Sequence, residues 1–322
     1  MASDARSKER HVQADPRRLY DGSTQAGDAL TLAGCLALAT GADIVAAAAY
    51  ESEPYLVRLE DVPVEVYIRE HAERLADEAA QRLPDEVAVL SLAIAATSPA
   101  AGLNQLAASQ EVDLLVIGSC HRGPVGRVLL GSTGARLMEA APCAVAVAPL
   151  GFGARAGAGL RVLAAAYDGF PEAEVALRCA QSLARSLAAQ LRVLAVASPP
   201  PPLPAAGSGF GGAGLSYAGL VEAIERATRD GLEHAVAELP ESVRPSGELL
   251  AGDPAVALAV AAEDGVDLLV MGSRGYGPFR RVLLGSVSAR LINMAPCPVL
   301  VIPRGAAAPE DAAALEADTL AR

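Results

Sequence analysis

Residues 266–303 read VDLLVMGSRGYGPFRRVLLGSVSARLINMAPCPVLVIP, and this stretch decides the fold because the chain contains it twice. Residues 112–149 read VDLLVIGSCHRGPVGRVLLGSTGARLMEAAPCAVAVAP, which matches at a constant offset of 154 residues. An earlier pair, Tyr20-Asp21-Gly22 and Tyr167-Asp168-Gly169, is offset by 147 residues. The second copy therefore carries an insertion, and the Pro/Gly-rich stretch at 198–219 is the natural place for it.

The duplication predicts two domains, in agreement with a length of 322 residues. Two short segments of polar or small residues flank the domains, and a Gly/Ala-rich segment separates them. We expect a flexible N-terminal arm at 1–16, a first domain at 17–150, a linker at 151–158, a second domain at 159–304 and a flexible tail at 305–322.

The second copy alternates short apolar runs with segments of helical periodicity. We expect strands at 160–166, 191–197, 247–251, 267–271 and 299–302, and helices at 173–189, 220–239, 255–263 and 286–294. Fully apolar strands that alternate with helices are typical of a parallel sheet with helices on both faces. The fold class is therefore α/β, with two tandem, doubly wound, five-stranded parallel sheets. Ligands of such folds bind beyond the carboxyl ends of the strands.

Composition excludes several functions. The net charge is −12 and the pI about 4.9, which disfavours nucleic-acid binding. The only lysine is Lys8, so a Walker-type phosphate loop is absent. The five cysteines form no Cys-x-x-Cys pair, the four histidines suggest no metal site, and no apolar run is long enough for a membrane span. We expect a cytoplasmic protein with no nucleic-acid or membrane partner, in which Cys143 and Cys297 are buried.

A glycine-rich loop follows the fourth strand of the second copy. Gly272-Ser273-Arg274-Gly275 is followed by nine residues and then by Gly285-Ser286, where a helix begins. Glycines allow tight turns that bring backbone N–H groups close to an anion. Ser286 can cap the helix, or its hydroxyl and the free helix N–H groups can bind a phosphate. Arg274, Arg280 and Arg281 can add positive charge.

This pattern, preceded by DLLVMGS and followed by APCPVLVIP, resembles the ATP-binding signature of the universal stress protein family. Tyr167-Asp168-Gly169 and Gly252-Asp253-Pro254 also match that family, and the resemblance covers both copies. It implies an adenine nucleotide α-hydrolase-like fold that binds ATP, with Mg²⁺ as an expected companion, and turns it over slowly or not at all. It also implies a regulatory or sensory role in the stress response.

The resemblance assigns roles to individual residues of the second copy. Asp168 would lie near the ribose and adenine, and the backbone of Val196 would contact the adenine edge. The residues expected around the phosphates are Gly272, Arg274, Gly275, Gly277, Gly285, Ser286, Val287 and Ser288. The simpler interpretations are that the glycines only form turns and that Asp168 bonds its own backbone in an Asp-Gly turn.

The first copy departs from the pattern at three places. His121 replaces the second glycine of the motif, Thr97-Ser98-Pro99 replaces Gly252-Asp253-Pro254, and the first strand is eroded by Pro16, Arg17 and Arg18. We interpret His121 as a solvent-facing loop residue rather than a phosphate ligand. The weaker candidates for nucleotide binding are Asp21, Gly118, Gly123, Gly131, Ser132 and Thr133. We therefore expect nucleotide binding mainly in the second copy.

The apolar last strands, at 144–149 and 298–302, would be an association hazard if left unpaired. We expect them to pair with each other or with a second chain, and the resemblance likewise implies intramolecular pairing of domains or a homodimer. Two alternatives remain open for the function. One is an ATP-using enzyme on the same fold, a nucleotidyl transferase or slow ATPase, and the other is a ligand-free interaction scaffold.

Overall fold

The computed structural model describes residues 23–51, 64–119, 121–122, 128–155, 157, 159–199, 217–273 and 285–303. The predicted arm and tail lie outside these residues.

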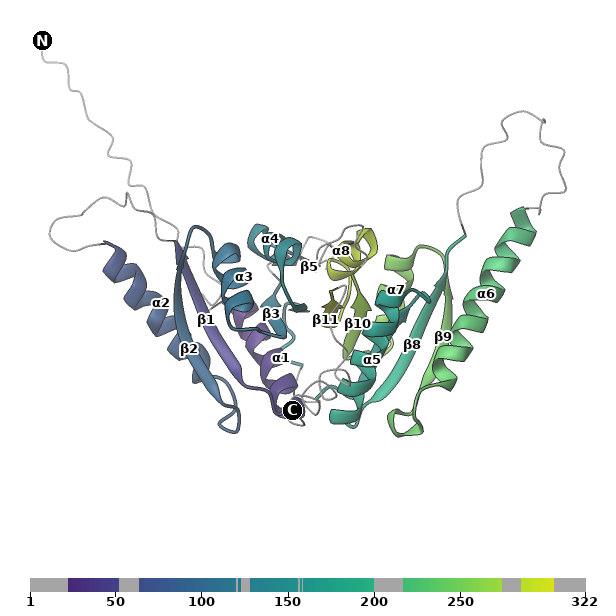
Figure 1. Ribbon diagram of the computed structural model, residues 1–322, viewed down its shortest axis with the longest axis horizontal. Helices are drawn as coiled ribbons and strands as arrows, with labels where there is room; N and C mark the ends of the chain where they lie inside the picture. The colour runs from purple at the N-terminus through teal and green to yellow at the C-terminus, as the bar shows by residue number, and fades with distance from the viewer. Residues whose placement is uncertain are drawn as a thin grey trace, which may run out of the picture.

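The described part of the second repeat contains five strands and four α-helices, close to the predicted ranges (Figure 1). They are β7 (Val162–Tyr167), α5 (Pro171–Ser186), β8 (Gln190–Ala197), α6 (Tyr217–Ala237), β9 (Ser246–Ala251), α7 (Pro254–Glu263), β10 (Leu268–Gly272), α8 (Ser286–Ile292) and β11 (Val299–Ile302). A short 3-10 helix lies at Glu241–Val243. The strands lie in the order β9-β8-β7-β10-β11 and all neighbours are parallel, as predicted for a doubly wound sheet.

The first repeat shows the matching elements except one. Its described elements are α1 (Thr24–Thr40), β1 (Ile44–Glu51), α2 (Val64–Ala80), β2 (Val89–Ala96), α3 (Pro99–Ser109), β3 (Leu114–Gly118), β4 (His121–Arg122), β5 (Val128–Leu129), α4 (Ser132–Ala140) and β6 (Ala144–Ala148). β1 pairs with β2 and β3 with β6, both in parallel. The predicted eroded first strand falls outside the described residues, so this repeat shows four of the five strand positions.

His121 lies in a strand rather than in a loop, which corrects the prediction for that residue. β4 and β5 pair antiparallel, with His121 opposite Leu129 and Arg122 opposite Val128. The motif residue of the first repeat therefore lies in a short antiparallel pair of strands, where backbone groups of β4 are used in pairing. Its side-chain placement lies outside the described structure.

The two repeats join through their last strands. β6 and β11 pair antiparallel, with Val299 opposite Val147, Leu300 opposite Ala146 and Val301 opposite Val145. This pairing makes one seven-stranded sheet, β3-β6-β11-β10-β7-β8-β9, and confirms that the last strands of the two copies pair within the chain.

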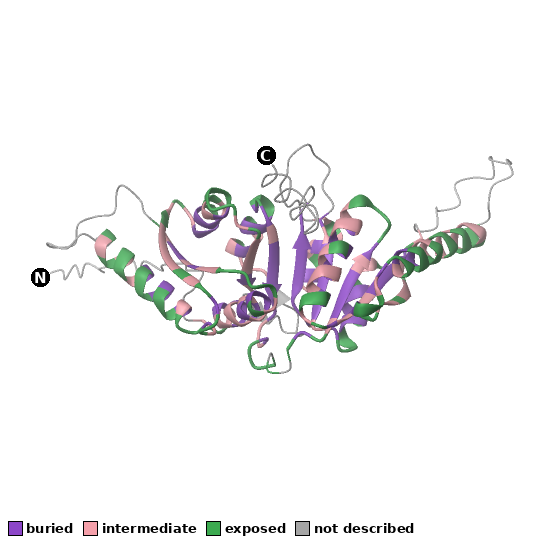
Figure 2. Cartoon of the chain, turned by 60° about the horizontal axis from the view of Figure 1, so that its bottom comes forward, coloured by how far each residue is buried: buried purple, intermediate pink, exposed green. Residues whose placement is uncertain are grey.

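Helices cover both faces of this sheet, and each layer draws on both repeats (Figure 2). On one face, α1, α5 and α6 bury a cluster that includes Leu32, Leu163 and Leu300. On the other face, α3, α4, α7 and α8 bury a cluster that includes Leu137, Leu269 and Leu291. A third cluster lies between α2 and the outer pair β1–β2. Burial of apolar residues in shared clusters couples the repeats into one unit.

The linker packs against the first repeat. The carboxylate of Asp28, in α1 and only 3% exposed, accepts hydrogen bonds from the N–H groups of Gly151 and Gly153, both at 2.7 Å. Phe152 between them is buried. Arg155 donates to the carbonyl of Pro296 in the second repeat at 3.3 Å. Buried carboxylates need such partners, so Asp28 fixes the chain where it passes between the repeats.

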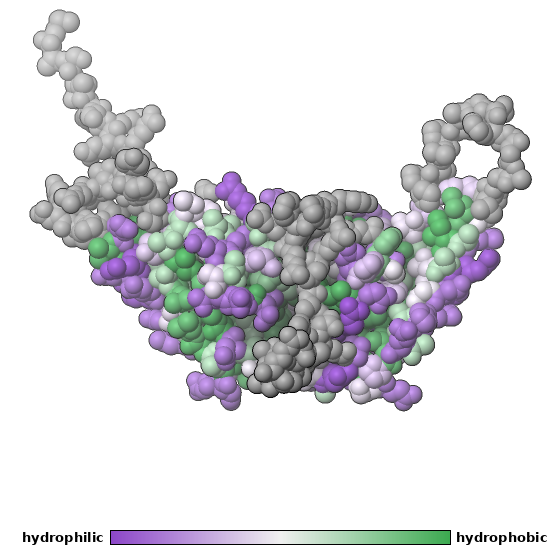
Figure 3. All heavy atoms as spheres, viewed as in Figure 1, coloured by the Kyte–Doolittle hydropathy of each residue, from purple (hydrophilic) through white to green (hydrophobic). Residues whose placement is uncertain are grey.

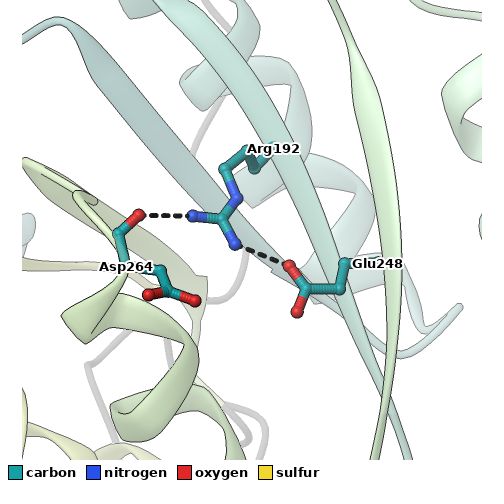
Figure 4. Close-up of polar contacts among 3 residues, drawn as sticks. All are labelled: Arg192, Glu248 and Asp264. Carbon is teal, nitrogen blue, oxygen red and sulfur yellow. Dashed lines mark hydrogen bonds and ion pairs between the residues drawn. The ribbon is translucent and has the colours of Figure 1, made fainter.

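Arg192 connects strand β9 and the end of helix α7 in the second repeat (Figure 4). Arg192 of β8 donates to the carboxylate of Glu248 in β9 at 2.6 Å and to the carbonyl of Asp264 at the end of α7 at 2.9 Å. The first repeat has an apolar residue at the position of Arg192, because Val45 corresponds to it by the 147-residue offset. Val45 lies opposite Leu90 of β2, which is 53% exposed. Figure 3 shows hydrophobic surface over β2 on this side.

Within the described part of the chain, no helix is long and apolar enough to cross a membrane.

Candidate functional site

The site predicted for the second repeat lies where the winding of the sheet changes direction, between β7 and β10. Ala165 of β7 stands opposite Val270 of β10, so Tyr167 and Gly272 lie at the same level. Asp168 and Ser273 therefore begin two neighbouring loops at one edge of the sheet. This carboxyl-end crevice is the place where doubly wound folds bind their ligands.

Asp168 forms the turn that the simpler interpretation predicts. Its Oδ1 atom accepts a hydrogen bond from the N–H of Phe170 at 3.2 Å, and Gly169 has a φ of +75°. Only glycine adopts that φ without strain, so the Asp-Gly pair shapes the chain between β7 and α5. Asp168 is also exposed at the crevice. Its role toward the ribose and adenine stays a prediction.

Gly272 has a packing reason to lack a side chain. A Cβ atom there would lie 2.6 Å from the backbone carbonyl oxygen of Glu172, in the first turn of α5. Gly118 repeats the arrangement in the first repeat, at 2.0 Å from the carbonyl oxygen of Gln25. Both glycines permit a helix to pack closely against the end of the fourth strand. This cause has no signal in the local sequence, because the contact joins segments about 100 residues apart.

Two buried serines next to these glycines were also missed. Ser119 and Ser273 are 0% exposed, and their hydroxyls find no hydrogen-bond partner within the described structure. Because side chains alternate along a strand, Ser273 points to the face covered by α7 and α8, as Met271 does. A buried hydroxyl without a partner is costly, so each of these serines needs a polar partner that the described residues do not supply. The only sequence signal was the Gly-Ser pair at the same place in both repeats.

The helix after the glycine-rich loop begins without a side-chain cap. Gly285 is the N-cap residue of α8 and Ser286 its first helical residue, so the interpretation of Ser286 as the cap is wrong. The first repeat matches, with Gly131 as the uncapped N-cap of α4 and Ser132 next. A glycine has no side-chain oxygen to accept from the first-turn N–H groups, so these groups keep their donors for other acceptors.

The remaining predicted residues are placed as follows. Val196 lies in β8 one residue beyond the level at which β7 ends, because Tyr167 stands opposite Ala195. Val287 is partly buried and packs on the cluster under α7 and α8, whereas Ser288 is only 2% exposed. Thr133 lies in the first turn of α4. Asp21, Gly123, Arg274, Gly275 and Gly277 lie outside the described residues.

An ion pair connects α8 to the start of α7. Asp253 caps α7 by accepting from the N–H of Val256 at 3.1 Å, and Arg290 of α8 donates to its other oxygen at 2.7 Å. Arg290 is the main reason that the pKa of the Asp253 carboxyl lies below its usual value. In the first repeat Ser98 caps α3 through its hydroxyl and carries no charge. The Gly-Asp-Pro motif therefore positions α8, and the first repeat lacks that contact.

Burial holds three ionisable groups neutral, the Tyr167 phenol at the end of β7 and the thiols of Cys143 and Cys297, which precede the last strands of the two repeats. Burial, assisted by a hydrogen bond to the Glu174 carboxylate, raises the pKa of the Tyr167 phenol well above its usual range. Burial raises the pKa of the Cys143 thiol to about 11 and that of the Cys297 thiol to about 12. Both cysteines are buried, as predicted, and their thiols do not ionise at neutral pH.

Among the residues that the structure describes, no group of three His, Cys, Asp or Glu side chains could hold a metal ion. A Mg²⁺ ion bound here would therefore depend on phosphate oxygens for most of its ligands.

The fold is that of a tandem α/β protein, and in its second repeat two neighbouring strands, β7 and β10, end at the switch point of the sheet. The model of the universal stress protein family matches residues 19–149 and 160–303. The chain belongs to this family. The first match leaves out residues 15–18, which align with the start of β7, whereas the second includes all of β7.

Relatives support the assignment over most of the chain. A universal stress protein of Mycobacterium tuberculosis is 30% identical over 268 residues, 78% of this chain and 85% of that protein. One from Thermus aquaticus is 34% identical over 139 residues, 42% of this chain and 94% of that protein. A solved universal stress protein from Archaeoglobus fulgidus superposes with a TM-score of 0.59 at 20% identity, covering 88% of this chain and 96% of that one, and so has the same fold. Another solved family member, in complex with cAMP, is 23% identical over 44% of this chain and 95% of its own, with a TM-score of 0.29.

Proposed function

We propose that this protein is a cytoplasmic regulatory sensor of the stress response that binds ATP, mainly in its second repeat, with little or no turnover. The observation that carries the proposal is that the carboxyl ends of β7 and β10 lie side by side at the switch point of the sheet. There an exposed Asp168 and a buried, unpartnered Ser273 hydroxyl begin neighbouring loops at the place where doubly wound folds take ligands. Membership in the universal stress protein family supports an adenine nucleotide as that ligand.

Two differences between the repeats favour the second. Only the second has the Asp253–Arg290 ion pair that fixes α8, and only the second has glycine where the first has His121. For the phosphates, backbone N–H groups and the Ser286 hydroxyl act as donors, and Mg²⁺ would bridge phosphate oxygens. Within the described residues, no pair of nucleophile and base lies at the crevice, which supports binding without designed turnover.

The test compares one serine in each repeat. Ser286 and Ser132 are both exposed first residues of uncapped helices, so their replacement by alanine leaves the cores intact. We expect ATP at 100 times its Kd to stabilise the wild type by about 2.7 kcal/mol. Ser286→Ala should lose most of this stabilisation, whereas Ser132→Ala should keep most of it. Thermal unfolding with ATP, ADP and cAMP, together with native mass spectrometry, measures the effect.

The outcomes separate the alternatives. A larger loss for Ser132→Ala would assign binding to the first repeat. Rapid phosphate or pyrophosphate release would identify an ATP-using enzyme. No stabilisation by millimolar nucleotide, and none retained on purification, would favour a ligand-free scaffold.

A further inference from the structure

The loop after β7 carries a large apolar side chain on the protein surface. Phe170 follows Asp168 and Gly169 and is 55% exposed, in a chain of which only 3% is aromatic. A single exposed apolar residue is ordinary on most of a protein surface. Phe170, however, lies at the carboxyl end of β7, beside β10, which is the switch point where doubly wound folds bind their ligands.

Hydrogen bonds hold the backbone of Phe170 at both of its polar groups. Its N–H donates to Oδ1 of Asp168 at 3.2 Å, and its carbonyl accepts from the N–H groups of Ala173 at 2.9 Å and Glu174 at 3.1 Å. The direction in which the side chain leaves the backbone is therefore fixed. A ring on a fixed backbone has few torsions left to order, so it loses little entropy when it contacts a ligand.

The first repeat has a serine at the equivalent place. By the 147-residue offset Phe170 corresponds to Ser23, whose hydroxyl accepts from the N–H of Ala26 at 3.3 Å and so caps α1. Phe170 is the N-cap residue of α5 and makes no side-chain cap hydrogen bond. Serine is favoured at this position of a helix and large apolar residues are disfavoured. The second repeat therefore lacks a stabilising cap and exposes an apolar ring instead, a combination that is typical of residues kept for binding.

We propose that Phe170 is a specificity-determining residue of the nucleotide site and that its ring stacks on the purine base. This inference rests on the proposed function, ATP binding in the second repeat. A purine has a flat face that stacks on aromatic side chains, which removes both faces from water. One short loop would then supply the carboxylate of Asp168, predicted to lie near the ribose and adenine, and an aromatic surface for the base. Ser23 gives the first repeat no such surface.

Replacement of the ring by the serine of the first repeat tests the inference. Phe170→Ser should raise the Kd for ATP about tenfold, because the stacking contact is lost. Phe170→Tyr keeps an aromatic face and should leave the Kd within about twofold of the wild type. The matched control is Val260→Ser in α7, where the side chain is 58% exposed and lies away from β7 and β10 along the sheet, and it should leave the Kd unchanged. Isothermal titration calorimetry measures all four proteins.

The stability of the ligand-free protein separates a binding role from a packing role. Phe170→Ser should not lower the free energy of unfolding in urea without nucleotide, because serine can cap α5 as Ser23 caps α1. The expected signs are therefore opposite, with weaker ATP binding and undiminished stability. A Phe170→Ser protein that unfolds more easily than the wild type would show that the ring packs on the protein, and would overturn the inference.

A fluorescent reporter gives a direct signal of stacking. The chain contains no tryptophan, so Phe170→Trp introduces a single one. Saturating ATP should remove roughly half of its emission, since a stacked base quenches an indole ring, whereas the emission of Val260→Trp should not change.

The outcomes distinguish this inference from the proposed function. ATP that binds Phe170→Ser with the wild-type Kd, or that binds Phe170→Trp without quenching it, would overturn the role of the ring and leave ATP binding intact. A wild-type protein that binds no ATP would contradict both proposals.

Discussion

Two separate requirements favour glycine at residue 272, which belongs to the predicted ligand motif. The motif predicts a glycine for close approach of a phosphate, and the structure shows that the α5 backbone also needs the space. A side chain at residue 272 is therefore expected to lower the stability of the folded protein even when no ligand is bound. Ser286, which is exposed, is the better residue for testing the ligand.

We expect Gly272→Ala to destabilise the protein without any ligand, by roughly 1–3 kcal/mol, because its Cβ would lie 2.6 Å from the Glu172 carbonyl oxygen. Urea unfolding in the absence of nucleotide measures this effect. The matched control is Gly231→Ala in α6, where an added Cβ meets nothing within 4 Å. That change should stabilise by about 0.5–1 kcal/mol, since alanine favours a helix. An unchanged free energy of unfolding for Gly272→Ala would contradict the packing argument.

Prediction from sequence succeeds at this scale when the cause is local. The Asp168–Gly169 turn follows from residue types alone, and the turn is present. Asp28 and Ser273 depend on what the fold brings near them, the linker N–H groups in one case and buried surroundings in the other. Neither residue had a signal strong enough to identify its role.

At the scale of elements, the α7–α8 corner distinguishes the repeats. The two N-caps, Asp253 and Ser98, satisfy the first turn of α7 and α3 alike. Only the aspartate adds a charge that Arg290 can pair with. The position of α8 therefore depends on the Asp253–Arg290 ion pair, which the first repeat lacks because it has Ser98 at that N-cap.

This difference predicts a pH dependence. The pKa of Asp253 is lowered in the folded state, so its stabilisation is present above the ordinary aspartate pKa of about 3.9 and is lost as the pH falls through the folded value. Asp253→Asn should therefore be more destabilising at pH 7 than at pH 3. Ser98→Ala should cost about 1 kcal/mol at both. Urea unfolding at pH 7 and pH 3 compares them, and a pH-independent effect of Asp253→Asn would exclude the ion pair as its cause.

The elements themselves were predictable because hydrophobic period and turn residues agree along the second repeat. Its strand and helix bounds differ from the predictions by only a few residues. At the start of α8 the sequence left open whether Ser286 caps the helix or offers its hydroxyl to a phosphate, and the first alternative is wrong. The N-cap is the glycine, because the backbone leaves its extended conformation only after residue 285.

At the scale of the whole molecule, the seam between β6 and β11 makes the two repeats one folding unit. Both core clusters draw residues from both repeats, and Ala146 at the seam is 0% exposed opposite Leu300. The antiparallel pairing of apolar last strands could be predicted from the sequence. The state of the first strand of the first repeat could not, because Pro16, Arg17 and Arg18 do not say whether that strand is shortened or built differently, and these residues lie outside the described structure.

We expect the wild type to unfold in one calorimetric transition and Ala146→Asp to unfold in two. An unpaired buried carboxylate costs about 3–5 kcal/mol and would uncouple the halves at the seam. Differential scanning calorimetry measures both, with Ala95→Asp on an exposed position of β2 as the control that keeps one transition. Two transitions in the wild type would show that the seam does not couple the repeats. Association with a second chain stays a separate prediction.

The β6–β11 seam lies within a single polypeptide, so dilution does not dissociate it. A pair of separate subunits would come apart at low concentration and could exchange partners, whereas here the local concentration of one half around the other is fixed by the linker. Each molecule therefore always holds one half of each kind, and mutations can alter one half while the other retains its sequence. Covalent union thus permits a division of labour that a symmetric pair of identical chains cannot evolve.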